Sequence, residues 1–179
     1  MNPQQHEFPD GTVLVLREAT PSDARAVRDH VEAISQESEF TTRSPGELPM
    51  SLEEEEAYIQ SFPDADNQVF LIGVVDEAIV GTLNFKGGRR QRTRHAGEFG
   101  MGVRQSWWGR GIGAMLIERL IAWAEGTEIV RKINLRVRED NTRAIRLYER
   151  SGFVREGILQ REFMVHGHFY ALVSMGREL

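Results

Sequence analysis

The chain has 179 residues, a formal net charge of −5, and 40% apolar and 27% charged residues. This length and composition predict one globular domain, and the acidic balance makes a nucleic-acid partner a poor match. The absence of cysteine excludes disulfides, thiolate metal sites and a cysteine nucleophile. The polar start, 1–8, does not match a secretory signal, and no run approaches the roughly 18 apolar residues of a membrane span. We therefore expect a cytoplasmic protein with no membrane partner.

The first half of the chain predicts a strand followed by two helices. The stretch 12–17 reads as the strand, and Thr20 to Asp23 supplies a capping hydroxyl, a proline and a carboxylate for the first helix. Residues 39–46 form a loop rich in turn formers. The second helix begins at Ser51, with Glu54 completing its capping box. We attribute the carboxylates at 53–56 to the positive end of that helix dipole.

The middle of the chain is rich in predicted strands. Stretches 68–75 and 78–85 flank a two-residue turn and predict a β-hairpin, and a third strand follows at 96–103. The loop between them, 86–95, carries five cations that could attract an anionic acceptor. A solvated hairpin tip is the simpler interpretation.

The second half alternates strands and helices. A glycine turn opens a helix, the stretch 133–138 alternates as a half-buried strand with Asn134, Arg136 and Arg138 on its polar face, and Asn141 begins another helix. The tail, 161–175, predicts a hairpin around His166-Gly167-His168. Two histidines without neighbouring carboxylates or cysteines are weak metal ligands, so we expect no metal. No linker or repeat interrupts the chain, and one domain over 1–179 is the prediction.

The glycine turn is the most informative motif. Gly109, Gly111 and Gly113 lie between a strand and a helix, where backbone N–H groups at the positive helix end can bind phosphate. The glycines could instead serve only a tight turn and close packing. A dinucleotide fingerprint is a further alternative, with Glu139 or Asp140 as its acidic residue. It fits poorly, because that fingerprint normally sits in the first βαβ unit of a longer parallel sheet.

Asn141 and Tyr148 form a second pair of candidates. Their seven-residue separation places them on one helix face, about 10 Å apart along the axis. This spacing suits an elongated ligand, with an amide at one end and a phenol at the other. The two residues could equally be a helix N-cap and a half-buried core tyrosine.

Together these motifs resemble the GNAT superfamily of coenzyme-A-dependent N-acetyltransferases. The resemblance is strongest at 108–113 (WGRGIG) and at 137–153, which matches the pattern V-x-x-x-N-x-x-A-x-x-L-Y-x-x-x-G-F. The branch that holds ribosomal-protein alanine acetyltransferases and amino-acid N-acyltransferases is the most similar. The resemblance implies a single α/β (α+β) domain. Its mixed, mostly antiparallel sheet would splay between the two central strands and be flanked by helices.

The resemblance also implies which residues hold acetyl-CoA. Backbone groups of Met101 and Val103 would pair with the pantetheine amides, and the turn from Gly109 to Ala114 would bind the pyrophosphate. The implied cofactor-binding set is Met101, Val103, Gly109, Arg110, Gly111, Ile112, Gly113, Ala114 and Asn141. The sequence departs from the commonest pattern at Trp108, where glutamine or arginine is usual.

A neutral amine must attack the thioester, so the site needs a proton acceptor and a donor for the departing thiolate. We expect Tyr148 to be the general acid and Glu98 the base, with His95 or a water chain as alternatives. Without cysteine, direct attack in a ternary complex is the expected route. The acceptor, a small-molecule or peptide amine, would enter against 39–46 and Tyr170, and the net acidity favours a cationic one.

The sequence leaves open two alternative functions and the oligomeric state. A catalytically silent acyl-CoA-binding sensor is the alternative to an enzyme, although such a sensor would not need the phenol of Tyr148. A nicotinamide-dependent enzyme using the same glycine turn is a third and weaker possibility. A homodimer is compatible with the sequence.

Overall fold

The computed structural model describes residues 1–47 and 50–179 and contains one eight-stranded sheet. The spatial order is β1-β2-β3-β4-β5-β6-β8-β7, in which only the β5–β6 pair is parallel. The strands are β1 (Gln4–Glu7), β2 (Val13–Glu18), β3 (Gln68–Val75), β4 (Ala78–Gly87), β5 (Ala96–Val103), β6 (Lys132–Arg138), β7 (Val154–Val165) and β8 (His168–Glu178). The predicted mixed, mostly antiparallel sheet is therefore confirmed.

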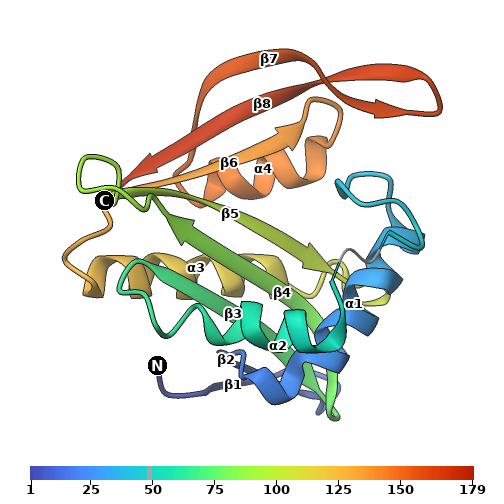
Figure 1. Cartoon of the computed structure of the whole chain (residues 1–179). Helices are drawn as coiled ribbons and strands as arrows, with labels where there is room; N and C mark the ends of the chain where they lie inside the picture. Colours follow the sequence, from blue (N-terminus) through green and yellow to red (C-terminus); the bar gives the residue numbers. More distant parts are fainter. Residues whose placement is uncertain (48–49) are drawn as a thin grey trace.

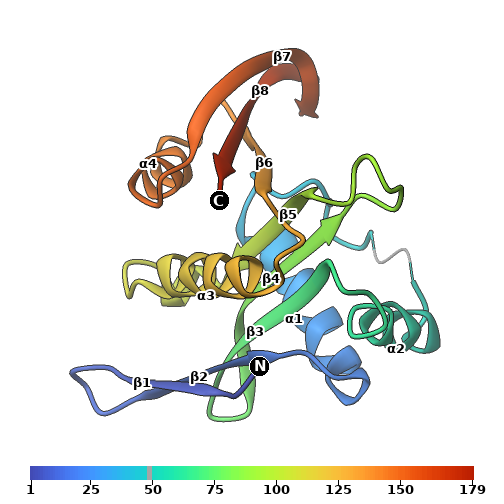
Figure 2. The ribbon, with the colours of Figure 1, turned by 90° about the vertical axis from the view of Figure 1, so that its left-hand side faces the viewer.

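In the part of the chain that the structure describes, four α-helices cover the two faces of this sheet (Figures 1 and 2). They are α1 (Ala24–Glu37), α2 (Leu52–Gln60), α3 (Ile112–Gly126) and α4 (Thr142–Arg150), with short 3₁₀ turns at Pro21–Asp23 and Gln105–Trp107. Figure 2 shows α1 and α2 on one side of the sheet, and α3 and α4 on the other. A larger core packs beneath α3 and α4, and a smaller one beneath α1 and α2.

The apolar pattern explains why these elements pack as they do. Ile112, Leu116, Leu120 and Ala124 recur at helical spacing in α3, and all are at most 1% exposed. Both predicted capping boxes form, at Thr20 with Asp23 and at Ser51 with Glu54.

The sheet opens between β5 and β6. Backbone pairing joins only three residues of each strand, from Ala96 to Glu98 and from Lys132 to Asn134. Beyond Glu98 the two strands diverge, which confirms the predicted splay. An opening of this kind leaves backbone donors and acceptors of β5 without a strand partner on that side.

Two elements and one residue differ from the sequence prediction. β1 is absent from it, and all four residues of β1 are exposed, so no apolar alternation marks it. The tail hairpin is longer than predicted, because β7 already starts at Val154. Arg138 was expected on the polar side of its strand, yet it is only 6% exposed.

Residues 1–47 and 50–179 include no helix that is both long and apolar enough to cross a bilayer.

Candidate functional site

A large cavity of about 960 Å³ runs through the splay of the sheet. Its walls come from both helical layers, with α1 and α2 on one side and α3 and α4 on the other. The predicted site residues that line it are Glu98, Met101, Val103, Gly109, Gly111, Ile112, Gly113, Ala114, Asn141 and Tyr148. The structure thus brings ten of the eleven predicted site residues to one space.

The glycine turn forms one end of the cavity. Gly109 and Gly111 both have φ +83°, a left-handed conformation that a side chain would strain, and Gly111 is the N-cap of α3. The intrahelical ladder begins with Met115 N–H donating to Gly111 O at 3.1 Å. The N–H groups of the preceding residues in the first turn have no partner within the helix, so they are available to an anion.

Gly113 keeps space open beside the turn. A Cβ at this position would lie 3.1 Å from Leu147 Cδ2 and 3.4 Å from Met101 Cε. Close packing and phosphate binding are therefore compatible here, and both interpretations of the glycines fit the geometry.

Strand β5 presents backbone groups to the opening. Its ladder with β4 includes Arg104 N–H to Val80 O at 3.0 Å and Gly88 N–H to Ala96 O at 2.9 Å. Because hydrogen-bonded pairs alternate along an antiparallel ladder, Met101 and Val103 point their N–H and C=O groups toward the splay.

Trp108 modifies this arrangement. Its indole N–H donates to the Val103 carbonyl at 2.7 Å, and the Arg143 guanidinium lies 4.6 Å from its ring centre. One of the backbone groups expected to meet the pantetheine arm therefore already has an internal partner. The N–H of Val103 and both groups of Met101 remain directed at the opening.

Asn141 and Tyr148 are compatible with ligand binding and also with purely structural roles, as a helix N-cap and a buried core tyrosine. Asn141 caps α4 by accepting a hydrogen bond from Ala144 N–H at 3.2 Å, which leaves its amide NH₂ for another partner. Tyr148 is 8% exposed and packs against Phe99 and Phe153, with ring centres 5.8 and 6.1 Å away. Burial raises the pKa of the Tyr148 phenol to about 12.

The two candidate bases differ in position. Glu98 lines the cavity with a side chain that is 48% exposed, and it forms an ion pair with Arg136 at 3.2 Å. His95 is exposed and is not part of the cavity wall. The geometry therefore favours Glu98 over His95.

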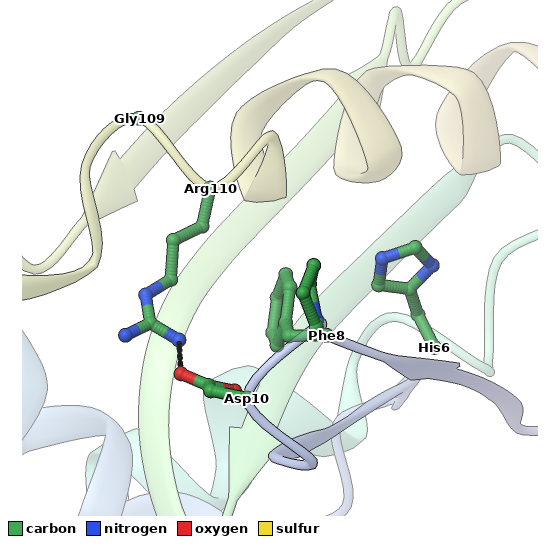
Figure 3. A pocket seen from close by; sticks show the side chains of 6 residues that line it. His6, Phe8, Asp10, Gly109 and Arg110 are labelled. Carbon is green, nitrogen blue, oxygen red and sulfur yellow. Dashed lines mark hydrogen bonds and ion pairs between the residues drawn. The ribbon is translucent and has the colours of Figure 1, made fainter.

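Arg110 is the one predicted cofactor residue outside the cavity. Its side chain reaches from the turn to Asp10, with a 2.8 Å ion pair (Figure 3). The Arg110 guanidinium also lies 4.7 Å from the Trp107 ring centre. The hydrogen bonds from Thr12 and the Arg110 guanidinium lower the pKa of Asp10 to about 2. Only the backbone of Arg110 remains in place to meet a phosphate.

A buried guanidinium joins three distant segments beside the cavity. Arg138 forms a bidentate pair with Asp140, at 2.7 and 3.0 Å, and donates to Glu39 O at 2.9 Å. Its guanidinium lies 4.3 Å from the ring centres of both Phe40 and Tyr170. Residues 40–43 line the cavity as expected, whereas Tyr170 contacts Arg138 instead.

Both acidic residues that a dinucleotide-binding fingerprint would use already have partners within the protein. Glu139 accepts a hydrogen bond from Ala171 N–H at 2.9 Å, and Asp140 is held by Arg138. Neither carboxylate is left for a ribose.

In the described part of the chain, no group of three or more metal-ligating side chains occurs, and His166 pairs instead with Glu39 at 3.0 Å.

Sequence reasoning missed several residues on the α1–α2 side of the cavity. Glu55 was attributed to the helix dipole together with its neighbours, but it is 6% exposed and lines the cavity. Burial raises the pKa of its carboxyl, and Arg43 and Arg28 partly oppose that rise. Tyr58 and Lys86 lie on the same side, with Lys86 Nζ 3.8 Å from the Tyr58 ring centre. Lys86 is one of the five cations of the predicted basic loop, and the only one of them in the cavity wall.

Comparisons with known proteins agree with this geometry. The L-amino acid N-acetyltransferase AaaT of Escherichia coli is 30% identical over 107 residues, 60% of this chain and 66% of that protein. A crystal structure of a GNAT-family acetyltransferase from Streptococcus pneumoniae superposes with a TM-score of 0.90 at 31% identity, covering 93% of this chain and 99% of that one.

The fold also matches yncA from Salmonella typhimurium, described as a putative acetyltransferase with its cofactor acetyl-CoA. Its TM-score is 0.80 at 18% identity, over 93% of this chain and 94% of that chain. The family model for the acetyltransferase (GNAT) family matches residues 32–153, a span that includes the glycine turn and both Asn141 and Tyr148. This chain therefore belongs to the GNAT acetyltransferase family.

Proposed function

We propose that this chain is an acetyl-CoA-dependent N-acetyltransferase. It would move the acetyl group to a primary amine of a small molecule, an amino acid or a peptide amino terminus. One observation carries the proposal: a single cavity connects the glycine turn, the open edge of β5 and the phenol of Tyr148. Family membership and the acetyl-CoA named with the yncA structure support the same cosubstrate.

The residues present fit coenzyme A. The turn at Gly109 and Gly111, with the first N–H groups of α3, would hold the pyrophosphate. Met101 and the N–H of Val103 would pair with the pantetheine amides. The free NH₂ of Asn141 would contact the same arm, because its Oδ1 is used by the helix cap.

The transfer requires a neutral amine. Its nitrogen lone pair attacks the thioester carbonyl carbon, the C–S bond breaks, and the proton from nitrogen passes to a base directly or through water. Glu98 is the proposed base, because its carboxylate lines the cavity next to the splay. Direct transfer is proposed because the chain has no cysteine to carry the acyl group.

Tyr148 would assist the departing sulfur. With a pKa of about 12 the phenol is protonated throughout the neutral range, so it is always a donor. Full proton transfer from so weak an acid is unfavourable, since thiols ionise near pH 8.5. The phenol therefore acts chiefly by donating a hydrogen bond that stabilises the thiolate.

Two measurements on the purified protein test this proposal. Calorimetry should detect acetyl-CoA binding, and thiol release should appear with at least one member of a panel of amino acids, polyamines, aminoglycosides and peptide amino termini. Binding without release from any acceptor would favour the acyl-CoA sensor over the enzyme. Failure to bind acetyl-CoA would overturn both.

A further inference from the structure

The α1–α2 side of the cavity contains a carboxylate to which the described residues supply no partner. Glu55 is 6% exposed, yet no hydrogen bond or ion pair to its side chain is found among residues 1–47 and 50–179. An ionised carboxylate is costly to bury unless a cation or hydrogen-bond donors compensate it. A ligand that brings a cation into the cavity would supply this compensation.

The position of Glu55 separates it from the proposed cofactor groove. It lies on α2, whereas the glycine turn and Tyr148 belong to α3 and α4 on the opposite face of the sheet (Figure 2). Since the cavity passes through the splay, Glu55 faces the part that the cofactor arm would leave to the acceptor.

The walls around Glu55 suit an organic cation. Val27, Val31, Met50, Tyr58 and Phe70 line the same cavity, and four of them belong to the core beneath α1 and α2, so apolar and aromatic side chains border the end of the cavity to which Glu55 belongs. Such a setting strengthens an ion pair by excluding water, and aromatic faces attract ammonium groups. The Tyr58 face already holds the Lys86 ammonium, 3.8 Å from its ring centre, so a cation of the ligand would have to be bound by the Glu55 carboxylate itself.

Among the described residues, none of the cations in the cavity wall forms an ion pair with Glu55. Arg136 pairs with Glu98 and Arg138 with Asp140, and Lys86 lies against Tyr58. Arg43 and Arg28 act on Glu55 only through their fields, without a direct ion pair. These guanidinium fields favour the ionised carboxylate, the form that can bind a cation.

We infer that Glu55 is the recognition site for a second cationic group on the acceptor, an ammonium or guanidinium distal to the amine that is acetylated. The inference rests on the proposed acetyltransferase function and narrows its acceptor class to diamines and other amines with a distal cation. Glu55 determines specificity here and takes no part in proton transfer.

Matched acceptors test this inference. Linear α,ω-diamines of three to eight carbons are compared with n-alkylamines of the same length, and kcat/KM is measured by thiol release. For the best diamine, Glu55→Gln should lower kcat/KM about 10- to 100-fold, the range expected for a hydrogen bond to a charged group. The alkylamine of that length should be unaffected. Glu56→Gln, an exposed neighbour on the same helix, should change neither value.

A binding measurement keeps the test independent of turnover. Calorimetry of the diamine with the protein saturated by coenzyme A should show the same 10- to 100-fold loss in Glu55→Gln. Equal effects of Glu55→Gln on diamines and alkylamines, or unchanged diamine binding, would overturn the inference while leaving acetyl transfer intact. If the wild-type protein acetylated none of the amines tested, that result would instead contradict the proposed function.

Discussion

In the proposed mechanism, the chemistry depends most directly on the phenol of Tyr148. Tyr148→Phe should lower kcat by roughly 10²-fold, because the departing thiolate loses its donor. In the described part of the chain the hydroxyl makes no hydrogen bond, so we expect little change in thermal stability or in acetyl-CoA affinity. Steady-state kinetics and calorimetry check both values. A phenylalanine variant with normal turnover across pH would remove Tyr148 from the mechanism.

One pair of variants can distinguish whether Glu98 or His95 is the general base. If Glu98 is the base, Glu98→Gln should lower kcat/KM and remove the acidic limb of its pH profile. His95→Gln should leave the profile unchanged, because His95 is exposed and outside the cavity wall. The reverse pattern would make the histidine the base, and an unchanged limb in both variants would favour a water chain.

Glu55 should reduce stability at neutral pH. Its pKa in the folded state is raised above the ordinary value of 4.5, so the unfolded chain ionises first as pH rises. The wild type therefore loses stability relative to Glu55→Gln from about pH 4.5 up to the raised pKa, and the difference is constant above it. Urea unfolding of both proteins between pH 4 and pH 7 measures this. A difference that shrinks with rising pH would show that the carboxylate is stabilised by partners in the fold.

At the scale of elements, the predicted helices and central strands follow from caps and apolar periodicity. The outer strands could not be found this way. β1 is exposed along its whole length, and β7 is exposed at its first nine residues, so neither shows the alternation that burial imposes. Register shifts in the β7–β8 pair further obscure that pattern.

The site residues that lie in local sequence motifs could be predicted, whereas those that tertiary packing brings to the cavity could not. The glycine turn, Asn141 and Tyr148 lie on local patterns, and the structure brings them to one cavity. Glu55 could not be told from its neighbours, because the run of four glutamates contains no signal for which one faces inward. Its spacing to Ile59, four residues on, is the only hint that both share a buried face.

The glycine turn can be tested as an element with a matched control. Gly109 and Gly167 have φ +83° and +78°, and in both cases a Cβ would meet nothing within 4 Å. Alanine at either position should therefore cost about 1–2 kcal/mol of stability through backbone strain alone. Only Gly109→Ala should weaken acetyl-CoA binding, by roughly tenfold, since Gly167 lies in the β7–β8 turn. Equal affinities in the two variants would exclude the turn as the phosphate site.

At the scale of the whole molecule, the net charge of the chain does not indicate the charge of the cavity wall. The chain carries −5, from which a cationic acceptor was expected. The cavity wall instead contains six cations and two carboxylates, namely Arg43, Lys86, Arg136, Arg138, Arg143 and Arg150 with Glu55 and Glu98. This positive lining suits a polyphosphate cosubstrate. A preference for cationic acceptors must therefore come from the local setting of Glu55 and not from the overall charge.

Arg138 connects the loop 39–46 to the sheet and to the tail hairpin. Its guanidinium pairs with Asp140 and donates to the Glu39 carbonyl, and it lies 4.3 Å from the ring centres of Phe40 and Tyr170. These partners lie as many as 99 residues from Arg138 along the chain. One side chain thus holds together segments that the backbone connects only distantly.

Arg138→Met should loosen this connection while preserving most of the side-chain volume. We expect a loss of about 2 kcal/mol in unfolding free energy, below the 3–5 kcal/mol of a fully buried pair because Asp140 is 43% exposed. Hydrogen exchange at 39–46 should accelerate, and the acceptor KM should rise, because residues 40–43 line the cavity. Arg155→Met, which removes an exposed pair with Glu149, should cost less than about 0.5 kcal/mol and leave exchange in that loop unchanged. If Arg138→Met matched this control in stability, exchange and KM, the loop would be held by its remaining contacts and not by the guanidinium.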